Sequence, residues 1–377
     1  CPTGSAYAPL TPRQALTPAP MALALPGFYT QQHWVSPNLI GGYSGNTVLP
    51  GFRGATISGG GRSGSINSIG ADYAAIGGGH GNTASQEFTT ISGGFKNSAN
   101  NEAATIASNC RHYAMCKIDY LGTGLCPAIK TNQYVSYYPE GRMDLYQALA
   151  NNAIPVTEGL LDVTNTCTLC GICDKQCYFI TELRPVKVMQ ALKDFVADHL
   201  QRQQAIVKIE PDAMLTQLQA IVGEQYATND PAHLITYATD PCPIASRKMP
   251  KYVVLPKTRE EIVHIVQLCK THELPYVVRG NGASTMGFAL GNGLVIDMNR
   301  MKAIVIDTDH WCAIVEPGVT AFELQQEANK HGLRANVAEP AATVCGNMMC
   351  SGIFSLFCAS YGTCANNCVN AEFVDPD

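Results

Sequence analysis

Hydrophobic and polar positions follow three patterns along the chain, and each pattern predicts a different kind of structure. Residues 1–37 are rich in proline and alanine without a period, which predicts an extended arm or linker. Residues 38–109 repeat an aliphatic residue followed by glycines, and the composition changes abruptly from residue 110 onward. The three patterns therefore predict several domains in series.

The repeat in residues 38–109 combines one isoleucine, a glycine turn and a polar return. Spacings of 17, 19, 15 and 15 residues separate its isoleucines, which are Ile40, Ile57, Ile76, Ile91 and Ile106. A coil this short cannot bury its own apolar edge, so we predict a solenoid-like stack of β-coils that cover one another. A flexible glycine-rich linker is the alternative, and the recurring isoleucines argue against it. The repeat resembles the head repeats of trimeric autotransporter adhesins, which implies a structural stack that forms an oligomer or binds a partner.

Residues 183–223 predict two helices. The second spans residues 211–223, and the first, over residues 183–203, begins near Pro185 and has these apolar residues at helical spacing: Val188, Leu192, Phe195, Val196 and Leu200. Beyond residue 250, short apolar strands alternate with helical segments. That alternation predicts a domain built from both strands and helices.

Charge and hydropathy narrow the range of functions. The 377 residues include 25 basic and 30 acidic side chains and no basic run, which argues against a nucleic-acid-binding protein. No apolar run reaches the roughly 18–20 residues that a transmembrane helix needs, and no signal peptide is visible. Cys1 fits either the lipid-bearing cysteine of a processed lipoprotein or an arbitrary start of the chain.

The sixteen cysteines of the chain are clustered. None lies between residues 2 and 109, and seven lie between residues 110 and 177. Disulfide scaffolds are short and spread their cysteines, so this clustering indicates reduced thiols that bind metal.

The run Cys167-x2-Cys170-x2-Cys173-x3-Cys177 matches the bacterial ferredoxin motif. In that motif three closely spaced thiolates hold one [4Fe–4S] cluster, and the fourth cysteine ligates another cluster. We therefore predict a [4Fe–4S] site. Zinc is the alternative, although zinc sites usually pair two Cys-x2-Cys motifs that lie farther apart.

Residues 110–126 contain a degenerate copy of this run, with Cys110, Cys116 and Cys126 and with Tyr113 at the place of a second cysteine. Together with residues 137–149, the region from residue 110 to about 180 resembles the two-cluster domain of iron–sulfur partners of flavin-dependent 2-hydroxyacid dehydrogenases. The resemblance implies a ferredoxin-like, α-helical iron–sulfur domain over residues 110–200.

Crossed ligation divides the seven cysteines into two predicted groups. The first group is Cys126 with Cys167, Cys170 and Cys173, and the second is Cys177 with Cys110 and Cys116. The second group lacks a fourth thiolate. It therefore uses another ligand, for which His112 is a candidate, or holds a three-iron cluster, or stays empty.

A glycine-rich loop follows an apolar strand near residue 279. Such a loop can turn its backbone N–H groups toward a pyrophosphate, because glycine permits the turn and the close approach. The residues are Arg279, Gly280, Asn281, Gly282, Ala283 and Ser284. No helix follows the loop directly, so we do not predict a dinucleotide-binding fold of the NAD type.

The order of elements from about residue 200 to the end resembles the FAD-binding domain of the vanillyl-alcohol-oxidase type family, in its glycolate/D-lactate dehydrogenase branch. The resemblance implies an α+β FAD-binding domain over residues 201–377, of which only the first subdomain is present. It implies that the 279–284 loop holds the FAD pyrophosphate and that further flavin-site residues are Pro317, Gly318, Thr343, Gly346, Asn347 and Gly352. Many relatives carry a flavin-linked histidine where this chain has Ala283, so we expect non-covalent FAD.

Two departures from that family matter. The family continues into a cap domain with substrate-binding residues, so we expect the substrate site to be missing or supplied by another chain. The C-terminal segment also contains unusual cysteines, which we interpret as apolar fillers, with a further cluster as the alternative. They are Cys345, Cys350, Cys358, Cys364 and Cys368.

These interpretations predict a multidomain iron–sulfur flavoprotein oxidoreductase subunit. FAD would take electrons from a 2-hydroxy acid such as lactate or glycolate, and [4Fe–4S] clusters would pass them to an acceptor protein or another redox subunit. The alternative is a structural or electron-conduit subunit, oligomerised by the repeat and without its own substrate site. No catalytic residue is assigned. Oxygen-sensitive cofactors favour the cytoplasm or the cytoplasmic face of a membrane, whereas the adhesin-like repeat and Cys1 allow export.

Overall fold

The computed structural model describes residues 27–85, 87–95, 98–99, 102–242, 245–336, 339–350 and 358–375. The chain divides into two compact units, Cys1–Asn101 and Glu102–Asp377. Within the described residues, no helix is long and apolar enough to cross a membrane.

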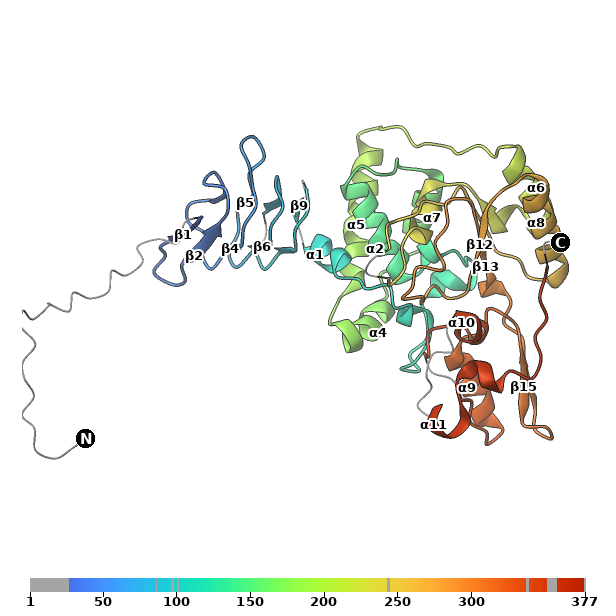
Figure 1. The fold of residues 1–377 in the computed structure, drawn as a ribbon. Helices are drawn as coiled ribbons and strands as arrows, with labels where there is room; N and C mark the ends of the chain where they lie inside the picture. Colours follow the sequence, from blue (N-terminus) through green and yellow to red (C-terminus); the bar gives the residue numbers. More distant parts are fainter. Residues whose placement is uncertain are drawn as a thin grey trace, which may run out of the picture. The chain divides into compact units, whose positions relative to one another are not determined.

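Short strands build the first unit (Figure 1). One sheet has the order β1-β2-β4-β6-β8 and the other β3-β5-β7-β9. The strands are β1 Phe28–Gln31, β2 Asn38–Gly41, β3 Thr47–Val48, β4 Thr56–Ile57, β5 Ser68–Ile69, β6 Ala75–Ile76, β7 Thr83–Ala84, β8 Thr90–Ile91 and β9 Ser98–Ala99. Apart from the antiparallel β1–β2 pair, each strand pairs in parallel with the equivalent strand of the next repeat.

The repeat isoleucines stack in register inside this unit. Ile40 pairs with Ile57, Ile57 with Ile76, and Ile76 with Ile91, and all four are buried. Burial of an isoleucine side chain stabilises a fold by about 1.5–3 kcal/mol, so the stacked positions supply much of the apolar core.

Buried asparagines hold the turns between the strands. The side-chain oxygen of Asn46 accepts from the backbone N–H of Asn67 at 2.9 Å, and that of Asn67 accepts from Asn82 at 3.0 Å. The Asn67 amide nitrogen donates to the carbonyls of Gly59 and Gly79, both at 3.1 Å. Each buried amide therefore satisfies backbone groups in neighbouring coils.

The structure places two elements differently from the sequence pattern. β1 lies inside the predicted 1–37 arm and pairs with β2, while residues 1–26 lie outside the described residues. Ile106, expected as the last repeat isoleucine, instead lies in helix α1 (Glu102–Ser108) and packs into the core of the second unit. The stacked isoleucines therefore end at Ile91.

The second unit begins with a helical region. Its elements are α1, η1 Met115–Lys117, η2 Pro127–Lys130, η3 Val135–Tyr137, α2 Pro139–Ala150, α3 Glu158–Asn165, α4 Ile172–Thr181 and α5 Pro185–Gln201. The predicted 183–203 helix is α5, with Pro185 in its first turn. Val188, Leu192 and Val196 of α5 are buried, whereas Phe195 is 43% exposed, so the apolar stripe is narrower than expected.

A four-stranded sheet of order β10-β11-β13-β12 follows, with β11, β13 and β12 parallel and β10 antiparallel to β11. The elements are α6 Ala213–Val222, η4 Glu224–Tyr226, β10 Ala227–Thr228, α7 Pro231–Leu234, η5 Ile235–Tyr237, β11 Tyr252–Val254, α8 Arg259–Thr271, β12 Tyr276–Arg279, β13 Leu294–Asp297 and η6 Met298–Arg300.

The two faces of this sheet bury different residues of the same strands. Val253 and Val295 pack with the helical region, whereas Val254, Leu294 and Ile296 pack with residues of α6 and α8. Figure 1 shows α6 and α8 on one side of the sheet and α2, α5 and α7 on the other. Because strand side chains alternate between faces, one short apolar run serves two cores.

The C-terminal part adds a hairpin and small helices: β14 Ile304–Asp307, β15 Cys312–Val315, α9 Ala321–Lys330, α10 Val344–Cys350, α11 Cys358–Tyr361 and η7 Cys364–Asn367. The Thr320 hydroxyl and the Glu323 carboxylate form a reciprocal capping box at the start of α9. This cap fixes the helix directly after the turn that contains Pro317 and Gly318.

Candidate functional site: two cysteine groups and a glycine loop

One small cavity brings together cysteines from two separate segments. Cys126 lines it from the start of η2, and Cys167, Cys170 and Cys173 line it from the segment before and within α4. These four residues are the first group predicted from the sequence.

The backbone between Cys167 and Cys173 forms a tight coil. Leu169 and Gly171 have φ angles of 57° and 81°, in the left-handed region, and Gly171 precedes the first turn of α4. This coil lets closely spaced cysteines border one cavity. Cys177 lies one turn farther along α4 and is not among the lining residues.

A buried arginine borders the same cavity. Arg142 of α2 is 1% exposed, and its Nη1 lies 3.7 Å from the Cys167 sulfur. Its Nε and Nη2 atoms have no hydrogen-bond partner in the described part of the chain. An unpaired buried guanidinium is costly, so this position fits an anionic group held by the neighbouring thiols.

The second cysteine group contains Cys110, Cys116 and Cys177. Burial raises the pKa of the Cys110 thiol, and the nearby Cys177 adds to the shift. Burial also raises the pKa of Cys116 well above its usual range. The negative charge of Glu140, whose Oε2 lies 3.9 Å from the Cys116 sulfur, raises this pKa further. The free thiols are therefore neutral, and metal binding would have to release their protons.

The expected substitute ligand, His112, already has a partner. Its Nε2 lies 3.0 Å from the Asp144 carboxylate, and Thr239 donates to the other oxygen of the same carboxylate at 3.2 Å. In this arrangement the Nε2 atom is directed to Asp144 rather than left open for a metal.

The described residues contain no group of three or more His, Cys, Asp or Glu side chains arranged to hold a metal ion. The cysteine-lined cavity differs from such a site in its dimensions. A single ion requires every ligand atom within about 2.0–2.3 Å of one point, whereas a cluster binds each thiolate through a different iron. Thiols around a cluster are therefore spread more widely than the ligands of a single ion.

The glycine loop begins where β12 ends, at the carboxyl edge of the parallel strands. Arg279 is buried, lies 5.4 Å over the Tyr237 ring, and leaves its Nε without a partner among the described residues. A Cβ on Gly280 would lie 2.5 Å from the Thr343 hydroxyl, and Gly282 has a φ of 77° beside the Arg279 guanidinium. Only glycine fits this close packing at both positions.

The carbonyl groups of the loop are held from the protein side. Asn299 donates to the Gly280 carbonyl at 3.2 Å, and Lys117 donates to the Asn281 carbonyl at 3.0 Å. Within the described residues, no hydrogen bond uses the backbone N–H groups of residues 281–284. A set of unpaired N–H groups in a glycine loop fits an anionic ligand such as a pyrophosphate.

A second set of predicted residues borders this loop. Thr343 forms a bridge with Thr320, and its hydroxyl accepts from the Gly346 N–H at 3.1 Å. Asn347 is 1% exposed, and neither of its amide atoms has a partner within the described residues. A buried amide without partners fits a polar ligand that supplies them.

The remaining predicted loop and turn residues have structural contacts. Gly318 donates its N–H to the Met301 carbonyl at 3.0 Å in the turn after Pro317. Ala283 packs beside Ala341, and the Ser284 hydroxyl accepts from the N–H of Met286 at 3.3 Å. Gly352, also predicted, lies outside the described residues.

Sequence reasoning missed the charged residues between the cysteines and the loop. Lys117, Glu140 and Arg142 are all buried. No local signal indicated this, because lysine, glutamate and arginine are almost never fully buried unless paired.

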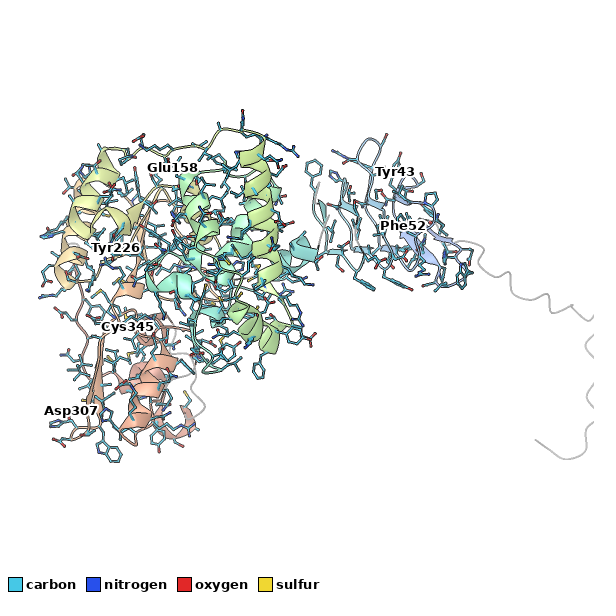
Figure 2. All side chains as sticks on the ribbon, turned by 180° about the vertical axis from the view of Figure 1, so that it is seen from behind. Tyr43, Phe52, Glu158, Tyr226, Asp307 and Cys345 are labelled. Atoms are coloured by element: carbon cyan, nitrogen blue, oxygen red, sulfur yellow. The ribbon has the colours of Figure 1, made fainter. Side chains whose placement is uncertain are left out.

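Among the described residues, the C-terminal cysteines do not show a shared site. Cys345 lies on α10, and in the view of Figure 2 it stands between Tyr226 at the sheet and Asp307 at the β14–β15 hairpin. Burial raises the pKa of Cys345, and the nearby Cys368 adds to the shift. Cys358 is half-buried and Cys368 exposed, while the side chains of Cys350 and Cys364 lie outside the described residues.

Residues 250–377 match the model of a protein family described as FAD binding domain. This segment includes the 279–284 loop together with Thr343 and Asn347. The match agrees with the fold and cofactor implied by the sequence resemblance over the same residues.

Curated relatives cover part of the chain. D-lactate dehydrogenase (cytochrome), mitochondrial, of Arabidopsis thaliana is 25% identical over 181 residues, which are 46% of this chain and 32% of that protein. Glycolate oxidase subunit GlcD of Bacillus subtilis is 30% identical over 120 residues, 31% of this chain and 25% of that protein. The chain thus spans a third or less of the length of these two relatives.

Among solved structures, the alignment with alkyldihydroxyacetonephosphate synthase covers 45% of this chain and 37% of the synthase chain, with 21% sequence identity and a TM-score of 0.40. The alignment with p-cresol methylhydroxylase covers 36% of this chain and 28% of the hydroxylase chain, with 22% sequence identity and a TM-score of 0.33. These overlaps are partial. The chain contains an FAD binding domain and is related, over part of its length, to D-lactate dehydrogenase and glycolate oxidase.

Proposed function

We propose, starting from the FAD binding domain at residues 250–377, that the chain is an iron–sulfur flavoprotein oxidoreductase subunit. In this proposal FAD takes electrons from a 2-hydroxy acid similar to lactate or glycolate, and iron–sulfur clusters carry them away singly. The main support is the cavity that Cys126 shares with Cys167, Cys170 and Cys173 in the same compact unit as the glycine loop.

Bound FAD would supply the hydride chemistry and the conversion from two-electron to one-electron transfer. The chain's own residues would bind and orient it. The N–H groups of residues 281–284 and the buried charge of Arg279 would face the pyrophosphate, and the unpaired amide of Asn347 would bond a polar edge of the ligand. Ala283 has no nucleophilic side chain, so the cofactor would remain non-covalent.

The cysteine groups would hold the clusters. Cys126, Cys167, Cys170 and Cys173 supply four thiolates for a first [4Fe–4S] cluster, and the buried cation of Arg142 offsets the negative charge of the ligated cluster. Cys110, Cys116 and Cys177 supply three thiolates for a second cluster. Clusters of this kind are assembled under reducing conditions, which favours a cytoplasmic location for this unit.

Partner proteins are part of the proposal. We propose that an acceptor protein or another redox subunit receives the electrons. We also propose that the stacked coils of residues 38–101 form a β-solenoid that organises a homo- or hetero-oligomer.

A second candidate function is a structural or electron-conduit subunit without its own turnover. The stacked coils favour it, since they contain a repeated apolar core and no reactive cluster of side chains among the described residues. Turnover of lactate or glycolate with an artificial acceptor would support the enzyme. Bound cofactors without turnover would support the conduit.

The decisive experiment is anaerobic reconstitution of the full chain with FAD, iron and sulfide. We expect one flavin and about four irons per chain for one cluster, or about eight for two, with a broad absorbance near roughly 400 nm that dithionite bleaches. Cys170→Ser should remove most of the iron bound by the first group, whereas Cys312→Ser on strand β15 should not. Fewer than about three irons in the wild type would overturn the iron–sulfur assignment, and absence of flavin would overturn the FAD assignment.

A further inference from the structure

We propose, on the premise of the FAD site above, that Lys117 is a positioning residue that holds the 279–284 loop in its ligand-binding shape and ties it to the turn that contains Cys116. Lys117 is the last residue of η1, directly after Cys116. Its side chain is only 2% exposed, although the residue lies 164 positions from the loop in sequence.

The Lys117 ammonium connects two structures. Its Nζ lies 3.0 Å from the Asn281 carbonyl and 2.6 Å from Oε1 of Glu140, and it lies 5.5 Å over the Tyr138 ring. The other oxygen of the Glu140 carboxylate accepts from the Cys116 sulfur at 3.9 Å. A chain of polar contacts therefore runs from the second cysteine group to the loop.

Apolar packing joins the same two segments independently. Ala114 and Ile118, on either side of Lys117, form a buried cluster with Ala341, and Ala283 of the loop packs against it. The Asn281 side chain donates to the Ala341 carbonyl at 2.6 Å. The loop is thus fixed by both its backbone and its side chains.

The orientation of the peptide group between Asn281 and Gly282 explains why the Lys117 contact affects ligand binding. In a trans peptide the carbonyl and the following N–H point in opposite directions. Because Lys117 holds the Asn281 carbonyl toward the protein, the Gly282 N–H points to the opposite side. On that side it can donate a hydrogen bond to the pyrophosphate of FAD. A charged donor makes this bond stronger than a neutral one would be.

The test measures FAD dissociation constants of the full chain by titration, with the visible circular dichroism of bound FAD as a second readout. Lys117→Met should weaken FAD binding by about tenfold or more and change the dichroism, because a hydrogen bond to a charged group is lost. Lys117→Arg keeps the charge and should restore most of the affinity. Lys193→Met is the matched control, because its Nζ also donates to a backbone carbonyl, that of Thr164, at 2.7 Å.

A double variant separates binding from folding. Lys117→Met alone leaves the Glu140 carboxylate buried and unpaired, and this should lower the thermal midpoint of unfolding. The double variant Lys117→Met with Glu140→Gln removes both charges and should restore the thermal midpoint. Affinity for FAD should stay low in the double variant. Equal FAD affinity in wild type, Lys117→Met and the double variant would overturn this inference alone, whereas a wild type that binds no FAD would overturn the proposed function and this inference with it.

Discussion

Buried asparagines in two regions of the molecule have opposite surroundings. Asn67, in the stacked coils, is fully buried, and its side chain bonds backbone groups of three other residues. Asn347, on α10, is equally buried, yet its two amide atoms have no partner in the described residues. The Asn67 side chain thus finds its partners within the coils, whereas the glycine-loop region contains polar atoms that a ligand would satisfy.

This contrast separates buried polar groups that stabilise the fold from those that could bind a ligand. A buried amide that stabilises a fold has its partners within the chain, because an unmade hydrogen bond costs free energy. A buried amide or guanidinium without partners persists when a ligand supplies them. Arg142 at the cysteine cavity and Arg279 at the loop are intermediate cases. Each has one nitrogen in contact with the chain and at least one nitrogen without a partner among the described residues.

Removal of a buried asparagine from the coils should cause the greatest loss of stability. Asn67→Ala should lower the free energy of unfolding of the first unit by about 2–4 kcal/mol, because the Asn82 N–H and the Gly59 carbonyl lose their buried partner. Hydrogen exchange of β4 to β7 would report the loss. Gln32→Ala, at an exposed position, serves as the control, and unchanged exchange in Asn67→Ala would show that the asparagine contacts do not stabilise the stack.

At the glycine loop we expect an effect on ligand affinity rather than on stability. Asn347→Ala should leave the thermal midpoint of the FAD-free chain unchanged or slightly raised, since neither amide atom has a partner among the described residues. The same change should weaken FAD binding by about tenfold, because the ligand loses one or two hydrogen bonds. Asn329→Ala on the exposed end of α9 is the control. A large stability loss without an affinity change would contradict the comparison.

A buried histidine should give the smallest effect, as a dependence of stability on pH. His233 bonds Ser136 at 2.7 Å and stacks on Tyr134, and burial lowers its pKa. The folded histidine stays neutral while the unfolded one gains a proton below a pH of about 6.5, so stability should fall as the pH falls, by at most about 1.4 kcal/mol per pH unit.

His233→Gln should reduce that slope in denaturant unfolding measured at several pH values. The control is His264→Gln, at an exposed position on α8. An identical slope in wild type and His233→Gln would show that the buried histidine is not the group responsible.

Local patterns in the sequence predicted much of the secondary structure. Helix α5 lies in the predicted 183–203 segment, and strands β11 to β15 alternate with helices α8 and α9 as predicted beyond residue 250, because these signals act within a few residues. The helix α1 was missed, since Ile106 continued the spacing of the coil isoleucines while its partners lie in the second unit.

The stacked isoleucines, the cysteine run and the glycine loop could be recognised from residue types and their spacing alone. The packing of distant segments makes Cys126 share a cavity with Cys167, brings Lys117 to Asn281, and leaves the Asn347 amide without a partner among the described residues. These contacts join residues that lie far apart in sequence. Spacing encodes contacts within a turn or a repeat, whereas the burial of a charge depends on packing between segments far apart in the chain.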